Sequence, residues 1–111
     1  MEIAESEIDG VLVLEPQGYI DSTNANAFTT QLMDIVRARR CSLVIDFQNV
    51  KYISSAGFRS LLIVGDAIEG MQRKLVLCGI AAEVRRVFAI TKFDELFVVC
   101  ATRSEAADVV K

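Results

Sequence analysis

Two kinds of hydrophobic pattern alternate along this chain. Near-continuous apolar runs at residues 43–47, 74–78 and 96–100 are typical of strands that are covered on both faces. Around these runs, apolar residues recur three and four positions apart, which is the spacing of a helix with one buried face. The alternation of strands and helices predicts a mostly parallel sheet with right-handed crossovers.

Helical spacing marks four segments, at about residues 22–39, 55–70, 83–88 and 103–110. Ser22 or Thr23 is the predicted N-cap of the first helix, because either hydroxyl can accept a hydrogen bond from a free N–H of the first turn. Gly70 is expected to end the second helix. Thr102 and Glu105 have the spacing of a capping box, which predicts a short final helix after the last strand.

The N-terminal segment predicts an antiparallel hairpin. Residues 2–6 and 11–16 flank the turn signal Ile8-Asp9-Gly10. Residues 18–21 are predicted to form a loop that leads into the first helix. The expected fold is a single α/β domain over residues 1–111, with a mostly parallel central sheet of about five strands, an N-terminal β-hairpin and about four covering helices.

Composition narrows the class of partner. With 111 residues, of which 52% are hydrophobic, the chain is long enough for one compact core and too short for two. Its net charge of -3 argues against nucleic acid or anionic lipid, since both need concentrated positive charge. The longest apolar runs are about five residues, a membrane span needs about 20, and the N-terminus is acidic where a signal peptide is basic. We therefore expect a cytoplasmic protein.

The sequence also excludes several kinds of chemistry. Without histidine, a Ser-His-Asp arrangement is impossible, and the chain has neither a Gly-x-Ser-x-Gly elbow nor a nucleotide-binding glycine loop. Cys41, Cys78 and Cys100 include no Cys-x-x-Cys pair, so neither a disulfide framework nor a zinc site is indicated. Asp21 and Asp46 could bind a metal, but solvated or capping carboxylates are commoner. We expect no catalysis, no metal and no cofactor.

Ser54 and Ser55 lie where a strand-like run gives way to helical spacing, so both hydroxyls are expected at the start of a helix. One interpretation is a cap, in which a hydroxyl accepts a bond from a free N–H and stabilises the helix by about 1 kcal/mol. The other is a phosphate acceptor, because an added charge of about -1.5 to -2 meets the positive end of the helix dipole. The residues alone leave both interpretations open.

Two further groups of exposed residues have alternative interpretations. Arg59, Ile63 and Asp66 fall on the helix face opposite the apolar one, and Ile63 is either an ordinary exposed hydrophobe or part of a contact surface. Three arginines within residues 37–40 form either an anion-binding patch or, as we favour, a complement to the dipole at the end of the first helix.

Several motifs together resemble the STAS domain, specifically the bacterial anti-sigma factor antagonists. They are Val44-Ile45-Asp46-Phe47, Tyr52-Ile53-Ser54-Ser55-Ala56-Gly57-Phe58-Arg59, Leu75-Val76-Leu77-Cys78-Gly79 and Val84-Arg85-Arg86-Val87-Phe88. Gly18-Tyr19-Ile20-Asp21 before the first helix extends the resemblance over nearly the whole chain.

The resemblance implies a partner-switching cycle. In that family an anti-sigma factor, which is also a serine kinase of the histidine-kinase-like ATPase fold, binds the unphosphorylated antagonist and so releases its target. The kinase ends the association by phosphorylating the antagonist at the helix-start serine, and a PP2C-type phosphatase resets it. The resemblance thus implies that this chain is the substrate of the kinase and the switch of the cycle. We expect it to be a monomer or a weak dimer.

Many family members have Asp before the phosphorylated Ser, then Ser or Thr, and then Gly. Aligning that Gly with Gly57 implies Ser55 as the acceptor, with Ser54 in place of the Asp and Ala56 in place of the second hydroxyl. Ser54 is the alternative acceptor. Asp21 matches a family acid in the loop near the kinase site. The expected partner surface consists of Asp21, Ser54, Gly57, Arg59 and Ile63.

A different class of function is the alternative. The chain would then be a constitutive STAS interaction subunit of a transporter or signalling assembly, in which the serine only caps the helix. Neighbouring genes for a kinase and a PP2C-like phosphatase favour the switch, whereas genes for transport components favour the subunit.

Overall fold

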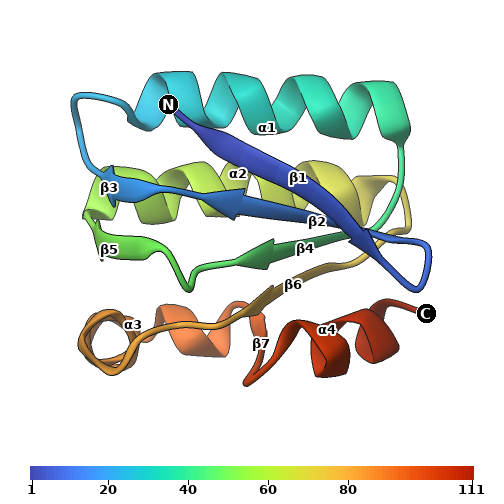
Figure 1. The fold of residues 1–111 in the computed structure, drawn as a ribbon. Helices are drawn as coiled ribbons and strands as arrows, with labels where there is room; N and C mark the ends of the chain where they lie inside the picture. Colours follow the sequence, from blue (N-terminus) through green and yellow to red (C-terminus); the bar gives the residue numbers. More distant parts are fainter.

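The computed structural model describes residues 1–111, apart from the side chain of Asp94, and contains a five-stranded sheet, a two-stranded ribbon and helices on both sides of the sheet (Figure 1). In chain order the elements are β1 (Ile3–Ile8), β2 (Val11–Pro16), β3 (Gly18–Ile20), α1 (Ala25–Arg39), β4 (Leu43–Asp46), β5 (Val50–Ile53), α2 (Ser55–Gly70), β6 (Leu75–Cys78), α3 (Ala82–Thr91), the 3-10 turn η1 (Phe93–Glu95), β7 (Val98–Cys100) and α4 (Arg103–Val110). The predicted α/β class is confirmed.

The central sheet has the strand order β1-β2-β4-β6-β7. Its first pair, β1 and β2, is the antiparallel N-terminal hairpin, and the other neighbours are parallel. Parallel neighbours need a crossover, and the three crossovers of this sheet contain α1, α2 and α3 in turn. The mostly parallel sheet with an N-terminal hairpin is therefore as predicted.

Both faces of the sheet are buried, which explains why its strands are almost continuously apolar. One row of cross-strand neighbours packs in the core with α1 and α2: Leu14, Ile45 and Leu77. The next row packs in a second cluster with Ala106 of α4: Val13, Val44 and Val76. In Figure 1, α1 and α4 accordingly lie on opposite sides of the sheet.

The two-stranded ribbon was not predicted, and the expectation that residues 18–21 form only a loop is wrong. β3 and β5 pair in parallel, with Tyr19 opposite Tyr52 and Ile20 opposite Ile53. The two isoleucines are 0% and 2% exposed, whereas the two tyrosines are 60% and 47% exposed. This is the in-and-out alternation of a strand, but it is too short in each segment to be recognised from the sequence.

The predicted N-cap of the first helix is also wrong, since α1 begins at Ala25 after Asn24. The hydroxyl and the N–H of Thr23 both donate to the Asp21 carboxylate. Asn24 Oδ1 accepts from the Asp21 N–H at 2.9 Å, and its amide nitrogen donates to the Tyr19 carbonyl oxygen at 2.8 Å. These side chains close the turn before the helix, so they are not free to cap it.

The last strand begins at Val98 instead of Leu96. The Leu96 N–H donates to the Phe93 carbonyl oxygen at 3.0 Å in the 3-10 turn, so it is unavailable to a sheet ladder. The predicted N-cap of the final helix is confirmed, because the Thr102 hydroxyl accepts a hydrogen bond from the Glu105 N–H at 3.2 Å.

A partly buried ion-pair cluster ties α4 to the sheet. The Arg103 guanidinium places Nη2 2.7 Å from Asp46 Oδ2 and 2.8 Å from Glu15 Oε2, and its Nε lies 2.9 Å from the same Asp46 oxygen. Asp46 is 4% exposed, and its other oxygen accepts from the Gln48 N–H at 2.9 Å. The hydrogen bond with Asp46 raises the pKa of Arg103 above its ordinary value. Asp46 is therefore a structural carboxylate that holds three elements together.

We expect Arg103→Ala to lower the free energy of unfolding by about 2–4 kcal/mol, because it leaves the buried Asp46 carboxylate without its cation. The matched control is Arg39→Ala, which removes the exposed 3.3 Å pair between Arg39 and Glu7 and should cost less than about 1 kcal/mol. Urea unfolding followed by circular dichroism measures both. Equal losses for the two variants would contradict the role given to Arg103.

Candidate functional site

The two adjacent serines differ in structure. Ser54 follows β5 and is the N-cap of α2, where its Oγ accepts from the Gly57 N–H at 3.4 Å. The Ser54 N–H itself donates to the Ile20 carbonyl oxygen at 2.8 Å. Ser55 is the first residue of α2, and its side chain is exposed while that of Ser54 is half-buried. The capping interpretation therefore describes Ser54, and the hydroxyl of Ser55 is left accessible.

Asp21 lies next to the serine pair because the β3–β5 ribbon places the ends of its two parallel strands side by side. Ile20 is opposite Ile53, so Asp21 and Ser54 are the next residues in the two strands. The carboxylate of Asp21 accepts from both the hydroxyl and the N–H of Thr23, and these bonds lower its pKa from the ordinary value. Asp21 is therefore a fixed negative charge at the mouth of this loop.

A hydrogen bond between two hydroxyls, one on α1 and one on α2, links the starts of these helices. Thr29 Oγ1 lies 2.6 Å from Ser60 Oγ, and Ser60 is 2% exposed. Ser60 Oγ also lies 3.2 Å from the carbonyl oxygens of both Ala25 and Ala56. Ala25 begins α1 just after the Asp21 turn, and Ala56 directly follows Ser55, so this link holds the two helix starts in one position.

Gly57 permits the close approach of α2 to the ribbon. A Cβ at this position would lie 2.6 Å from Ile53 Cγ1 and 2.8 Å from Ile20 Cγ2, which is closer than real Cβ contacts. The structure places Gly57 in the buried layer, beneath the surface that carries Ser55. Any effect of Gly57 on a partner is therefore exerted through the position of the loop.

Arg59 and Ile63 continue the exposed face of α2 from Ser55, since each follows the last by four residues. Ile63 is 46% exposed, and the side chain of Arg59 is exposed as well. The structure thus brings four of the five predicted partner residues to the surface in one region: Arg59 and Ile63, which are exposed on α2, and Asp21 and Ser54, which are half-buried near the helix start.

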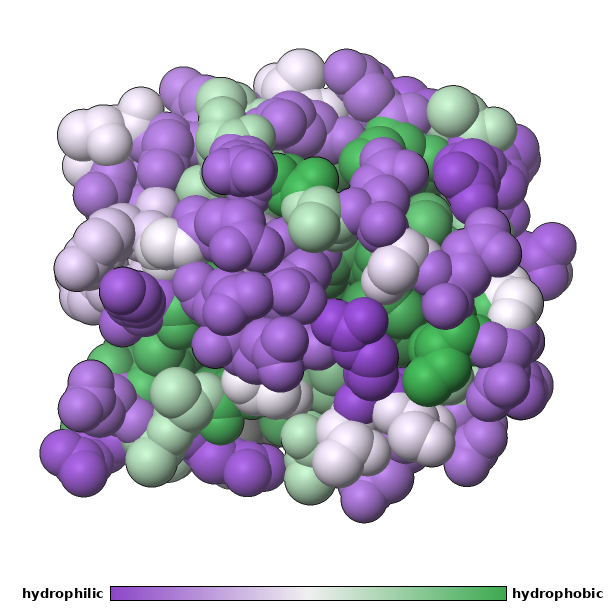
Figure 2. All heavy atoms as spheres, viewed as in Figure 1, coloured by the Kyte–Doolittle hydropathy of each residue, from purple (hydrophilic) through white to green (hydrophobic). Residues whose placement is uncertain are grey.

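A small hollow borders this region. The face shown in Figure 2 is largely hydrophilic, but apolar atoms gather over the space between β5 and α3 at the lower left. The hollow there has a volume of about 100 Å³ and is lined by Lys51, Tyr52, Ile53, Glu83, Val84 and Val87. Sequence reasoning missed the exposed Tyr52 because it expected a loop instead of a strand at this point.

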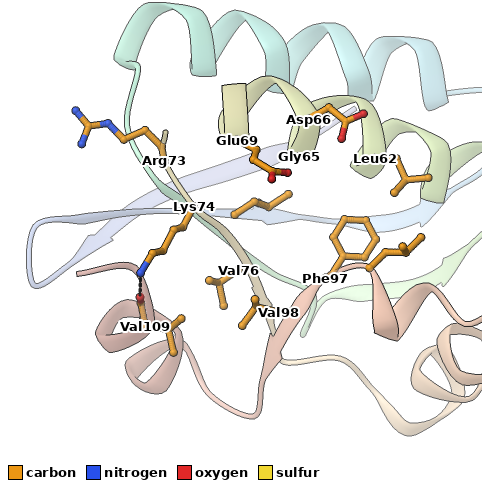
Figure 3. A pocket seen from close by; sticks show the side chains of 12 residues that line it. Leu62, Gly65, Asp66, Glu69, Arg73, Lys74, Val76, Phe97, Val98 and Val109 are labelled. Atoms are coloured by element: carbon orange, nitrogen blue, oxygen red, sulfur yellow. Dashed lines mark hydrogen bonds between the residues drawn. The ribbon is translucent and has the colours of Figure 1, made fainter. Parts of the chain in front are cut away.

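A larger groove lies elsewhere, between α2, β6, β7 and α4 (Figure 3). Its volume is about 290 Å³, and Phe97, Val98 and Val109 contribute apolar side chains to its floor and walls. Lys74 Nζ bridges to the Val109 carbonyl oxygen at 3.2 Å. The groove shares no lining residue with the Ser54–Ser55 loop, so it is a separate feature.

Cys78 is buried in the sheet. Burial raises the pKa of its thiol to about 12, which makes it a poor nucleophile.

Among the side chains that the structure describes, no cluster of three His, Cys, Asp or Glu could hold a metal ion. Within the same described residues, no helix combines the length and apolar character needed to cross a membrane. Arg39 of the arginine group pairs with Glu7 at the surface.

The fold and this loop define a known class of regulatory domain. The STAS domain family model matches residues 2–106, and the chain belongs to this family. The resemblance noted in the sequence is thus confirmed at the level of the family.

Individual relatives agree with this class. The chain is 36% identical over 111 residues to a Bordetella bronchiseptica protein named as an anti-sigma factor antagonist, BtrV, and the match covers 100% of this chain and 96% of that protein. An anti-sigma factor antagonist from Thermotoga maritima has a TM-score of 0.89 at 21% identity, covering 97% of this chain and 93% of the other. The phosphorylated form of Bacillus SpoIIAA has a TM-score of 0.70 at 16% identity, covering 99% and 100%. The two structures share the fold.

We expect Gly57→Ala to lower the free energy of unfolding by about 1–3 kcal/mol, because the added methyl group overpacks Ile20 and Ile53. Gly65→Ala in the same helix is the matched control, since its Cβ would meet Leu75 at an ordinary 3.5 Å. That change should be neutral or stabilise by up to about 1 kcal/mol, owing to the higher helix propensity of alanine. Urea unfolding compares the two, and a stabilising Gly57→Ala would contradict the close packing.

Proposed function

We propose that this STAS domain is an anti-sigma factor antagonist controlled by phosphorylation of Ser55. Its unphosphorylated form binds, in the cytoplasm, an anti-sigma factor that is also a serine kinase of the histidine-kinase-like ATPase fold. Phosphorylation ends this association, and a PP2C-type phosphatase restores the binding form. The protein acts as a substrate and a binding partner, not as an enzyme, and as a monomer or weak dimer.

The exposed position of Ser55 at the first residue of α2 is the observation that carries the proposal. A phosphoryl group there meets the free N–H groups and the positive dipole end of a 16-residue helix, so the fold can accommodate its charge. Ser54 is a weaker candidate, because its Oγ already accepts from the Gly57 N–H and its side chain is half-buried.

The neighbours of Ser55 suggest how the phosphate ends binding. Asp21 already contributes a fixed negative charge beside the loop, and phosphorylation adds about -1.5 to -2 more. A partner surface that accommodates Asp21 and a neutral hydroxyl then faces a concentrated negative charge. Repulsion and steric blocking weaken the complex without requiring the antagonist to unfold.

The relatives support the same function. The Bordetella protein is named as an anti-sigma factor antagonist, and its match covers all 111 residues of this chain. SpoIIAA of Bacillus shares the fold and exists in a phosphorylated form. Both facts describe those proteins and favour, for this chain, a phosphorylated antagonist over other uses of the STAS fold.

The second candidate function is a constitutive STAS interaction subunit of a transporter or signalling assembly. The Ser54 cap favours it, since that hydrogen bond already gives the serine pair a structural purpose. A neighbouring gene for a kinase or for a PP2C-like phosphatase favours the switch, whereas neighbouring genes for transport components favour this alternative.

We expect Ser55→Ala to abolish phosphorylation by the partner kinase with ATP, because it removes the accessible hydroxyl at the start of α2. Intact mass and phosphosite mapping measure the result. Ser54→Ala is the matched control: it should still be phosphorylated, while losing about 1 kcal/mol of stability with its cap. Undiminished phosphorylation of Ser55→Ala would contradict the assignment of Ser55.

We expect Ser55→Asp to keep the circular dichroism of the unmodified protein and to lose binding to the partner kinase. The added charge is local, and a carboxylate in the first turn is favourable to the helix dipole. Titration calorimetry measures binding, with Ser55→Asn as the uncharged control that should retain more of it. An unfolded Ser55→Asp would favour a purely structural role for this residue.

A further inference from the structure

The two tyrosines of the chain lie side by side on its surface. Tyr19 in β3 and Tyr52 in β5 are directly opposite in the parallel ribbon. They are 60% and 47% exposed, although each is a large, partly apolar side chain. Four of the six phenylalanines behave differently: Phe28, Phe47, Phe58 and Phe88 are each 0–1% exposed.

Packing within the domain does not account for this pair. Opposite aromatic residues commonly stabilise a sheet by ring contact, but the ring contacts among the described side chains join only phenylalanines. Neither phenol hydroxyl donates or accepts a hydrogen bond within the part of the chain that the structure describes. The pair therefore has unused aromatic surface and unused hydrogen-bonding groups.

The pair is continuous with the proposed phosphorylation site. Tyr19 precedes Asp21 by two residues and Tyr52 precedes Ser54 by two, so all four side chains fall on the outward face of the ribbon and its ends. An extended chain puts the Cα atoms of Tyr52 and Ser55 at most about 10 Å apart. A partner that covers Ser55 with an interface of ordinary size also covers this pair.

Tyr52 also borders a hollow into which a partner side chain can reach. It lines this hollow of about 100 Å³ together with Val84 and Val87 of α3. Tyrosine loses little conformational entropy on binding and combines apolar area with a polar hydroxyl, and it is enriched among the residues that dominate binding energy.

We propose that Tyr19 and Tyr52 form the aromatic anchor by which the anti-sigma factor kinase recognises this antagonist. The inference rests on the proposed function and adds residues outside the serine loop to it. The matching face of the kinase is apolar and carries acceptors, carbonyl or carboxylate oxygens, for the two phenol hydroxyls. The hollow beside Tyr52 is lined by one charge of each sign, Lys51 and Glu83, so it leaves the choice of acceptor to the two hydroxyls.

The experiment uses the purified chain and the anti-sigma factor kinase that the proposed function assigns to it. Tyr19→Ala and Tyr52→Ala should each weaken binding at least about tenfold in titration calorimetry, as truncation of an interface anchor does. Both should also slow phosphorylation of Ser55 when the kinase is below saturation. Tyr52→Phe keeps the aromatic ring and removes only the hydroxyl, so it should lose less binding than Tyr52→Ala; the comparison separates the contribution of the hydroxyl from that of the ring.

The matched control is Ile90→Ala, which removes a large apolar side chain that is 75% exposed on α3. It should bind and be phosphorylated as the unmodified protein is. If Tyr52→Ala fails to fold, Tyr19→Ala and Tyr52→Phe still test the anchor, because Tyr19 does not line the hollow and Tyr52→Phe keeps the ring that does.

Three results would overturn the inference. If the unmodified chain binds and is phosphorylated but the tyrosine variants do so equally well, the anchor is wrong and the proposed function stands. If Ile90→Ala weakens binding as much as they do, the recognition is not specific to the tyrosines. If the unmodified chain neither binds the kinase nor is phosphorylated by it, the proposed function fails, and the anchor fails with it.

Discussion

The close contact between α2 and the β3–β5 ribbon governs the geometry of the whole candidate site. Gly57 lets the first turn of α2 rest on Ile20 and Ile53, and those two residues are followed at once by Asp21 and Ser54. One apolar contact therefore sets the position of both loops. The Ser54 N–H bond to the Ile20 carbonyl oxygen, 2.8 Å long, adds a polar constraint at the same place. Because interiors are close-packed, a change of one methyl group here moves the chemistry at the surface.

Polar contacts at two places behind the site reinforce this arrangement. The hydroxyls of Thr29 and Ser60 join α1 to α2 one turn behind the serine loop. On the other face of the sheet, Arg103 joins α4 to Asp46 and Glu15. Such groups are costly to leave unpaired, so they disfavour alternative packings more than apolar contacts do. The domain is thus a rigid support that presents a few exposed residues.

The sequence predicted the elements whose patterns are long and failed where the signals are short. The apolar runs, the turn signal between the first two strands and the helical spacings identified all five strands of the central sheet, partly or fully, as well as the four α-helices. The β3–β5 ribbon escaped, since three or four residues of alternation cannot be told from a loop. The same failure hid Tyr19 and Tyr52. Ser54 was recognisable as a cap candidate from chemistry, but only the backbone distinguishes it from Ser55.

The rigidity of the domain and the reach of an added charge together determine what a switch at Ser55 can do. At physiological ionic strength, charges at a surface are screened beyond about 8 Å. Under the proposed function, a phosphoryl group on Ser55 therefore acts on its own loop, on Asp21 and on the partner surface that faces them. Because the start of α2 accommodates the added charge without unfolding, the charge acts mainly on an interface that covers Ser55. Under the proposed function, the antagonist changes partners while its fold stays the same.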